Sequence, residues 1–292
     1  MNAVSNVEKT NDMQFSALMS VYIKEKPEFL DASLYSILIK QSVIPDEVVL
    51  IKDGPLTDEL ELVIKKYHSK YPSILKVVEL PINVGLGRAL NTGLLECSYS
   101  LIARMDSDDI SAYNRFESQL KRFQINPNLD LIGSNIVEFF DSPDDPKFVK
   151  VLPTEIADIR KMIKRRNPIN HVSVMFRKEA VMETGGYMHL LYLEDYYLWV
   201  RMLNNGCNME NINENLVYVR TGEKMFERRS NRKYITSWYK LQKAMQRFSL
   251  INRLDMFINM VNITVFILTP PRIKQYIYKV FLRKDVNAVD II

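Results

Sequence analysis

The chain has 292 residues, of which 47% are hydrophobic and 25% charged, a composition typical of a globular protein. This balance excludes a collagen-like or an intrinsically disordered chain. Its two cysteines, Cys97 and Cys207, lie far apart in the sequence, which excludes a disulfide framework and a cysteine zinc cluster. Because the first fifteen residues lack the apolar segment of a secretory signal, we expect a cytoplasmic protein.

Charge is unevenly distributed along the chain. Residues 228–292 contain 13 Lys and Arg against 3 Asp and Glu, whereas residues 1–227 carry a net charge of −6. Basic tails bind nucleic acid or anionic membranes, or they form ordinary solvated helices. Charge alone leaves these alternatives open.

The first third of the chain alternates short apolar runs with helical periodicity, the pattern of βαβ units with a parallel sheet. We expect strands at 16–22, 47–52, 75–80 and 101–105, and helices from Pro27 toward Pro45, over 57–71 and from the 83–87 loop to Cys97. Proline suits the first turn of a helix, and Thr57 is a good N-cap. Four such strands with three crossovers form half of a nucleotide-binding α/β domain.

Beyond Asp106 the periodicity is mixed. We expect helices over 115–126 and 194–205, strands near Leu131 and over 172–177, and a surface loop at 141–146. From residue 229 the pattern predicts helices, with a break at Pro270-Pro271.

Acidic residues follow the fourth expected strand directly, in the segment 106–109 (Asp-Ser-Asp-Asp). This places them at the carboxyl edge of the sheet, where α/β folds bind ligands. Crowded carboxylates repel one another unless a cation neutralises them, and ligation by oxygen alone suits Mg²⁺ or Mn²⁺. The competing interpretation is a set of helix caps for the following helix. An EF-hand is excluded, because Ile110 and Ser111 occupy its fifth ligand and glycine positions.

Two further segments reach the same expected edge. Asp53, in the string Asp-Gly-Pro, follows the second strand and could accept a hydrogen bond from a base or ribose, although this string is also a common turn. The 83–87 loop has neither the GxGxxG pattern nor a Walker lysine. Its backbone N–H groups and Arg88 could still bind an anion at a helix start; otherwise Arg88 is an ordinary surface arginine.

A second acidic pair, Glu194 and Asp195, begins an aromatic helix. One carboxylate bordering a cleft there could serve as a general base, or both could simply complement the helix dipole. His171 could contact an acceptor or be a structural histidine. Downstream, Arg220, Arg228 and Arg229 could hold a pyrophosphate, unless the pair Arg228-Arg229 only begins the basic tail.

Five segments together point to one family: 16–22, 53–55, 83–91, 104–109 and 194–201. In this order they resemble the family 2 glycosyltransferases of GT-A fold, in particular bacterial enzymes of O-antigen and exopolysaccharide assembly, the amylovoran-biosynthesis type. The resemblance covers roughly residues 15–230. It implies an α/β fold with a Rossmann-like mixed sheet: a disordered N-terminus over 1–14, a catalytic domain over 15–228, and a basic helical region over 229–292.

The resemblance also implies roles for individual residues. Asp53 would contact the uracil of a UDP-sugar, Asp106 the ribose or the metal, and Asp108 the Mn²⁺ or Mg²⁺ that bridges the diphosphate. Asp195 would deprotonate the acceptor hydroxyl, while Glu194 orients it. Relatives that carry a metal-binding histidine after the last strand differ from this chain, which has the segment 219–222 (Val-Arg-Thr-Gly) there. The remaining metal ligands would then be diphosphate oxygens and water.

The implied reaction is inverting transfer of galactose or glucose from a UDP-sugar to an undecaprenyl-diphosphate-linked saccharide, with a β-linkage as product. Two rival classes remain: a metal-dependent nucleotidyl or phosphate transferase, and a non-enzymatic binder of anionic surfaces. Residues 256–268 are apolar but too short to span a bilayer, so we expect them to lie in the membrane surface on the cytoplasmic face of the inner membrane. An ordinary packed helix is the alternative. We expect no nucleic-acid partner.

Overall fold

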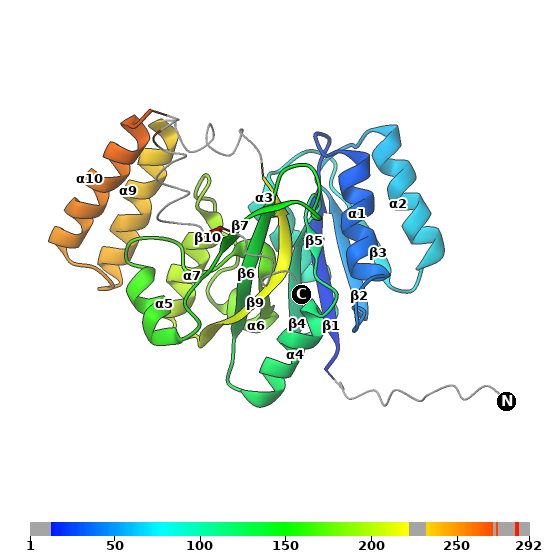
Figure 1. Cartoon of the computed structure of the whole chain (residues 1–292), viewed down its shortest axis with the longest axis horizontal. Helices are drawn as coiled ribbons and strands as arrows, with labels where there is room; N and C mark the ends of the chain where they lie inside the picture. The colour runs from blue at the N-terminus through cyan, green and yellow to red at the C-terminus, as the bar shows by residue number, and fades with distance from the viewer. Residues whose placement is uncertain (1–12, 222–231, 271–272, 274–283, 286–292) are drawn as a thin grey trace.

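One large mixed sheet runs through the computed structural model of the chain, which describes residues 13–221, 232–270, 273 and 284–285 (Figure 1). The sheet order is β10 (Lys284–Asp285), β7 (Pro146–Lys150), β6 (Leu131–Phe139), β8 (Met175–Arg177), β4 (Leu101–Asp106), β1 (Phe15–Val21), β2 (Glu47–Lys52) and β3 (Leu75–Glu79). Strand β9 (Met209–Arg220) pairs with both β6 and β5 (Ile110–Ser111). Apart from Met13 and Gln14, the expected disordered N-terminus lies outside the described residues.

The amino-terminal half is the expected parallel βαβ unit. Its strands are β1 (Phe15–Val21), β2 (Glu47–Lys52), β3 (Leu75–Glu79) and β4 (Leu101–Asp106), and its helices are α1 (Pro27–Leu38), α2 (Asp58–Lys70) and α3 (Leu86–Glu96). All three strand pairs are parallel, which confirms the prediction. Helix α1 ends well before Pro45, because Gln41 turns inward and donates to the carbonyls of Ser36 and Ala112.

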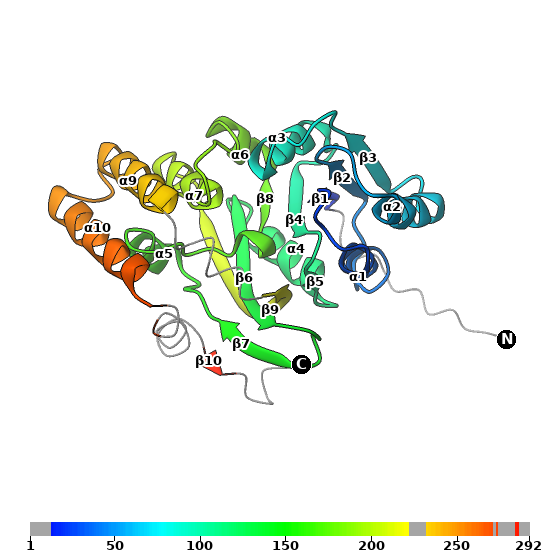
Figure 2. The same cartoon turned by 90° about the horizontal axis from the view of Figure 1, so that it is seen from above.

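Alternation along β1 separates two apolar layers. Leu18 packs with α3, whereas Ala17 and Met19 pack on the other face with α1 and α2. Figure 2 shows the sheet edge-on between these layers. Since each residue of a strand points to the face opposite its neighbour, β1 is buried on both sides.

The carboxyl-terminal half extends the sheet. It contains β5 (Ile110–Ser111), α4 (Arg115–Ile125), β6 (Leu131–Phe139), β7 (Pro146–Lys150), α5 (Ile156–Met162), β8 (Met175–Arg177), α6 (Lys178–Glu183), α7 (Glu194–Asn204) and β9 (Met209–Arg220). Strand β8 pairs antiparallel with both β4 and β6, which makes the sheet mixed. The predicted strand over 172–177 is wrong in its first half, because His171–Ser173 forms a 3₁₀ turn in which Ser173 bonds back to Asn170.

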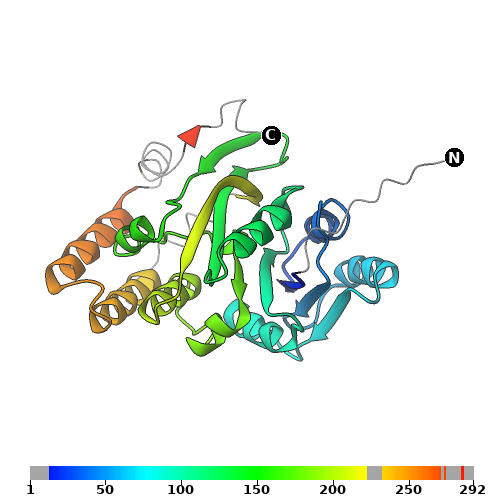
Figure 3. The same ribbon diagram turned by 90° about the horizontal axis from the view of Figure 1, so that it is seen from below.

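The tail forms helices α9 (Arg232–Arg247) and α10 (Arg253–Leu268), followed by the short strand β10 (Lys284–Asp285), which pairs with β7. A capping box between Asn252 and Asp255 starts α10. Trp238 and Leu241 of α9 belong to the same apolar core as α7, and fully burying side chains of this size contributes about 1.5–3 kcal/mol each. Figure 3 shows both helices beside α5, at the end of the molecule opposite α2. Among the described residues, no helix is both long and apolar enough to cross a bilayer.

Candidate active site

The aspartates after β4 form a tight cluster. Carboxylate oxygens of Asp106, Asp108 and Asp109 all lie within 4.8 Å of one another. They do not cap the next helix, because α4 begins after Asn114 and has no side-chain cap. The structure therefore excludes the capping interpretation and brings the three carboxylates together.

Hydrogen bonds fix this cluster from two sides. Ser33 of α1 donates to the carbonyl of Asp106 (2.8 Å), and the backbone N–H of Arg220 donates to Asp109 Oδ1 (3.0 Å). The second oxygen, Asp109 Oδ2, is buried and has no hydrogen-bond partner in the described part of the chain. A buried carboxylate oxygen without a donor is costly unless something else binds it.

The pKa values of the clustered carboxyl groups also favour a bound cation. Burial, followed by the charges of Asp106 and Glu25, raises the pKa of Asp108 to about 7. Burial and the neighbouring aspartates raise the pKa of Asp109 well above its usual value. Without a cation, the raised pKa values mean that these carboxyl groups bind protons more readily than isolated aspartates do. A hard divalent cation, which prefers oxygen ligands, therefore fits this donor set.

Arg104, the first residue of the 104–109 segment, is buried beside Asp106. Its guanidinium pairs with Asp106, while its Nε and Nη1 atoms are buried without partners among the described residues. Its positive charge lowers the pKa of Asp195, which burial raises, and it also helps to lower the pKa of His171. An arginine within an otherwise apolar strand was the signal in the sequence for this role.

Asp53 is hydrogen-bonded to the loop before α3. Its two carboxylate oxygens accept from the N–H groups of Val84 (2.7 Å) and Gly85 (3.1 Å). Gly54 has a φ of +89°, and a Cβ at this position would lie 2.7 Å from the backbone nitrogen of Asn83. The Asp-Gly-Pro string is thus more than an isolated turn, since it holds the loop against the strand end.

Helix α3 connects this loop to the second acidic pair. Asn91 exchanges two hydrogen bonds of 2.7 Å with the backbone of Tyr187. A Cβ on Gly87 would lie 3.6 Å from side-chain atoms of both Glu194 and Tyr187. Glu194 therefore lies beside the start of α3, and Arg88, one residue further along, is exposed.

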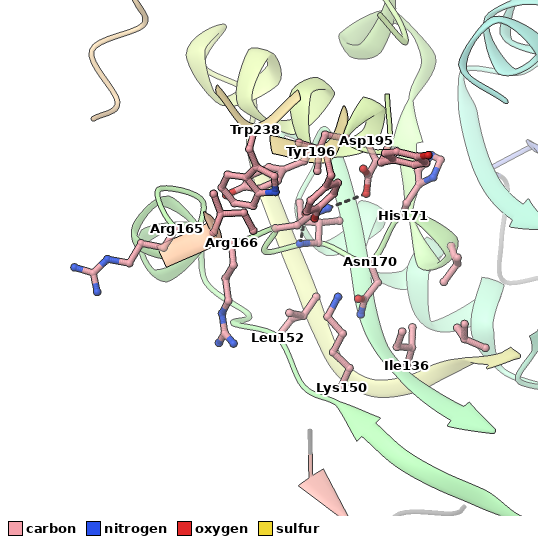
Figure 4. A pocket seen from close by; sticks show the side chains of 18 of the residues that line it. Ile136, Lys150, Leu152, Arg165, Arg166, Asn170, His171, Asp195, Tyr196 and Trp238 are labelled. Carbon is pink, nitrogen blue, oxygen red and sulfur yellow. Dashed lines mark hydrogen bonds between the residues drawn. The ribbon is translucent and has the colours of Figure 1, made fainter. Parts of the chain in front are cut away.

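Asp195 faces elsewhere, into a cavity of about 620 Å³ that is also lined by His171 and Asn167 (Figure 4). Asn167 Nδ2 donates to Asp195 Oδ2 (2.7 Å). Burial raises the pKa of Asp195, opposed by the backbone N–H of Tyr196, the charge of Lys150 and the hydrogen bond from Asn167. Glu194 and Asp195 are adjacent in sequence but face different parts of the structure, as expected for neighbours on a helix.

The surroundings of His171 favour its neutral form. Burial, helped by the charge of Arg104, lowers its pKa well below the usual value. Its Nε2 lies 2.9 Å from the Tyr187 hydroxyl, and its ring packs against Tyr187 and Trp199. A neutral imidazole held in this way can exchange a hydrogen bond but is no source of positive charge.

Arg220 is held firmly at the end of β9. Its guanidinium lies 3.8 Å from the ring centroid of Phe29 and 4.6 Å from that of Phe139, and it donates to the carbonyl of Asp141 (3.2 Å). Arg229 lies outside the described residues, so the structure does not place it.

Comparison with known proteins identifies the family. The profile described as "Glycosyl transferase family 2" matches residues 16–184. The chain is 40% identical over 271 residues to an Escherichia coli protein named "UDP-Gal:alpha-D-GlcNAc-diphosphoundecaprenol beta-1,3-galactosyltransferase", covering 93% of this chain and 97% of the relative. It is 37% identical to the "Amylovoran biosynthesis glycosyltransferase AmsE" of Erwinia amylovora, covering 91% and 98% of the two chains.

The fold agrees with this assignment. The structure of S. aureus TarS 1-349 in complex with UDP-GlcNAc matches 92% of this chain and 77% of that one, with a TM-score of 0.63 and 19% identity. At this identity the likeness concerns the fold alone. The α/β architecture is the GT-A fold, as the sequence predicts, and the chain belongs to glycosyltransferase family 2.

Proposed function

We propose that this glycosyltransferase moves a hexose, galactose or glucose, from a UDP-sugar to a saccharide linked to undecaprenyl diphosphate, with inversion to a β-glycoside. The observation that carries the chemistry is Asp195, a carboxylate facing a cavity, with the charge of Arg104 acting on both Asp195 and the acidic cluster at the end of β4. The donor, acceptor and linkage are supported by the E. coli relative, whose name states all three. Family membership speaks against both rival classes.

The acidic cluster is the proposed metal site. Asp106, Asp108 and Asp109 would hold Mn²⁺ or Mg²⁺, because their oxygens converge and Asp109 Oδ2 has no donor among the described residues. When bound, such a cation neutralises negative charge on the diphosphate leaving group. Arg104, buried beside Asp106, keeps the cluster's own charge partly compensated.

Asp195 is the proposed base. It takes the proton of the acceptor hydroxyl, whose oxygen forms a bond to the anomeric carbon while the bond from that carbon to the UDP oxygen breaks. The electron pair leaves with UDP, and attack from the opposite side converts an α-linked donor into a β-linked product. Asn167 orients the carboxylate, and its N–H donor helps keep Asp195 ionised.

The remaining expected residues have proposed binding roles. Asp53, which also holds the 83–87 loop, is the proposed contact to the uracil, and Arg88 lies exposed at the start of α3, where an anion is favoured. Arg220 and Arg229 are proposed donor contacts. The backbone N–H of Arg220 donates to Asp109, which places this residue next to the acidic cluster. His171 and Glu194 are proposed to contact the acceptor.

We also propose that the protein is peripheral to the cytoplasmic face of the inner membrane. Helix α10 exposes one apolar side, formed by Leu254, Phe257, Ile258, Val261, Val265 and Leu268. Its other side packs on the body through Met256, Met260, Ile263 and Ile267. A helix with one buried side and one exposed apolar side suits a membrane surface, where the lipid-linked acceptor resides.

A screen of donors tests the proposal. The purified protein is incubated with Mn²⁺, a synthetic GlcNAc-α-diphosphate-lipid and each of several UDP-sugars, and products are identified by mass spectrometry. We expect a mass gain of one hexose with UDP-galactose or UDP-glucose. Pyrophosphate release from a nucleoside triphosphate without sugar transfer would support the phosphate-transfer rival, and the absence of both reactions would support the binder.

A further inference from the structure

The cavity beside Asp195 has a strongly basic side. Lys150 at the end of β7 and Arg165 and Arg166 after α5 all line it. In Figure 4 the Lys150 and Arg166 side chains extend along the cavity below Asp195, whereas the guanidinium of Arg165 points away. The charge of Lys150 also lowers the pKa of Asp195, so the two groups are close enough to interact.

These cations are distinct from the residues proposed to bind the donor, although Val219 and Thr221, on either side of Arg220, also line the cavity. None of Asp53, Arg88 and the three clustered aspartates lines the cavity. Two carboxylates do line it, Asp195 and Glu138. Neither Arg165 nor Arg166 forms an ion pair with a carboxylate in the described part of the chain. The basic side of the cavity therefore suits an anion other than the donor diphosphate.

The tail contributes apolar side chains to the same cavity. Trp238 of α9 and Ile263 and Phe266 of α10 line it. From there the same helix continues to its exposed apolar side, where Phe257 is 66% and Val265 59% exposed. A base, cations and an apolar wall thus line one cavity, and part of that wall belongs to the helix that carries the exposed apolar side.

We propose that this cavity binds the acceptor's lipid diphosphate: Lys150 and Arg166 hold the diphosphate, and Trp238, Ile263 and Phe266 contact the first part of the hydrocarbon chain. The inference rests on the proposed function, which places the acceptor hydroxyl at Asp195. It adds that α9 and α10 are part of the acceptor site as well as a membrane contact. An amphiphile with sugar, diphosphate and lipid has a group for each kind of partner that the cavity offers: a base, cations and apolar side chains.

The test compares two acceptors with identical sugar and undecyl chain, one a diphosphate and one a monophosphate. Charge-assisted hydrogen bonds to a phosphate are strong, so Lys150→Gln and Arg166→Gln should each raise the acceptor KM for the diphosphate roughly tenfold or more. The KM for the UDP-sugar should stay unchanged, and the preference for diphosphate over monophosphate should shrink. Arg160→Gln on α5 removes the same charge outside the cavity and is the matched control.

A binding experiment separates failure of this inference from failure of the proposed function. Decyl diphosphate and decyl monophosphate are titrated calorimetrically into protein saturated with UDP and Mn²⁺, which fills the donor site. Diphosphate binding that weakens in Arg166→Gln but not in Arg160→Gln supports the inference even if no sugar is transferred. Unchanged binding and acceptor KM in both cavity variants, or a rise in the donor KM instead, would overturn it while leaving the transferase proposal intact.

Discussion

Asp195 and Glu194 show how neighbouring carboxylates acquire different tasks. On an α-helix, consecutive side chains point about 100° apart, so only one of the two can face a given centre. Asp195 lines the cavity and is oriented by Asn167, whereas Glu194 lies beside the start of α3. Burial raises the pKa of both, but only Asp195 also lines the cavity in which a substrate hydroxyl could lie.

Replacing the proposed base should therefore slow the chemical step. Asp195→Asn keeps the size and most hydrogen bonding but removes the basicity, so we expect turnover to fall roughly 10²-fold or more with little change in the donor KM. Steady-state kinetics on both substrates measure this. Glu194→Gln is the matched control and should retain far more turnover; the reverse pattern would assign the base to Glu194.

Asp108 gives a pH dependence with a defined sign. In the folded protein without a cation its pKa is raised from 3.8 to about 7, so the native state binds a proton that the unfolded chain releases. The free energy of unfolding then decreases as pH rises from about 4 to 7, and a bound cation, which displaces this proton, offsets the loss. We expect Mn²⁺ to raise Tm more at pH 8 than at pH 5.5.

Thermal unfolding of Asp108→Asn supplies the control for this prediction. The variant should lose most of the Mn²⁺ effect on Tm at both pH values, and its transfer activity should be abolished. Chelation with EDTA should abolish wild-type activity reversibly. Full activity of Asp108→Asn in excess EDTA would contradict a metal role for the cluster.

At the scale of elements, the loop between β3 and α3 depends on one close contact. Gly54 combines a φ of +89° with a backbone approach that leaves no room for a Cβ. Gly54→Ala should lower the free energy of unfolding by about 1–3 kcal/mol and raise the KM for the UDP-sugar, because the loop must move. Gly85→Ala has a similar φ, +87°, but meets no atom within 4 Å, so it should cost less in denaturant unfolding. Equal effects in both variants would indicate that φ strain alone matters.

Helix α10 should attach the protein to anionic vesicles through its exposed side. Replacing Phe257 and Val265 by serine removes apolar area from that side without touching the packed side, so vesicle binding in a flotation assay should fall several-fold. Hydrolysis of the UDP-sugar should remain. Truncation at Asp255 is a poorer test, because it also removes the cavity wall formed by Ile263 and Phe266. Unchanged flotation of the double variant would favour an ordinary packed helix.

The elements that were predictable from the sequence depend on nearby residues, whereas the others depend on partners far away in the chain. Pro27, Thr57 and the apolar runs act within a few residues, and the helices and strands they indicate form nearly where expected. A last strand before Val219 was expected, but its bounds could not be predicted, and strand β9 pairs with β6 over most of its length. Its sequence carries many Asn and Glu residues, so its apolar alternation is weak and its pairing depends on partners far away in the chain.

On the scale of the whole molecule, the site lies where the two halves of the fold meet. Strand β4 carries the acidic cluster, and β8 beside it brings in the segment that contains His171. Asn91 ties α3 to Tyr187, and Arg104 acts electrostatically on both the cluster and Asp195. Tail helix α9 then joins the same core as α7.

This arrangement explains which parts of the candidate site the sequence could predict. Asp53 and the 106–109 segment follow strands directly, so their common edge was predictable from the parallel pattern. The contacts of Lys150, Asn167 and Trp238 with the cavity were not, because they come from elements that meet only through the antiparallel half and the tail. The membrane role of the tail stays a prediction.

The anomeric configuration of the product tests the central claim most directly. The protein is incubated with Mn²⁺, an α-linked UDP-hexose that it accepts and a GlcNAc-diphosphate-lipid, and the coupling constant of the new anomeric proton is measured by NMR. A single direct displacement assisted by Asp195 predicts a large coupling, as for a β-galactoside or β-glucoside. A small coupling, which indicates an α-linkage, would contradict the inverting mechanism and with it the role of Asp195 as base.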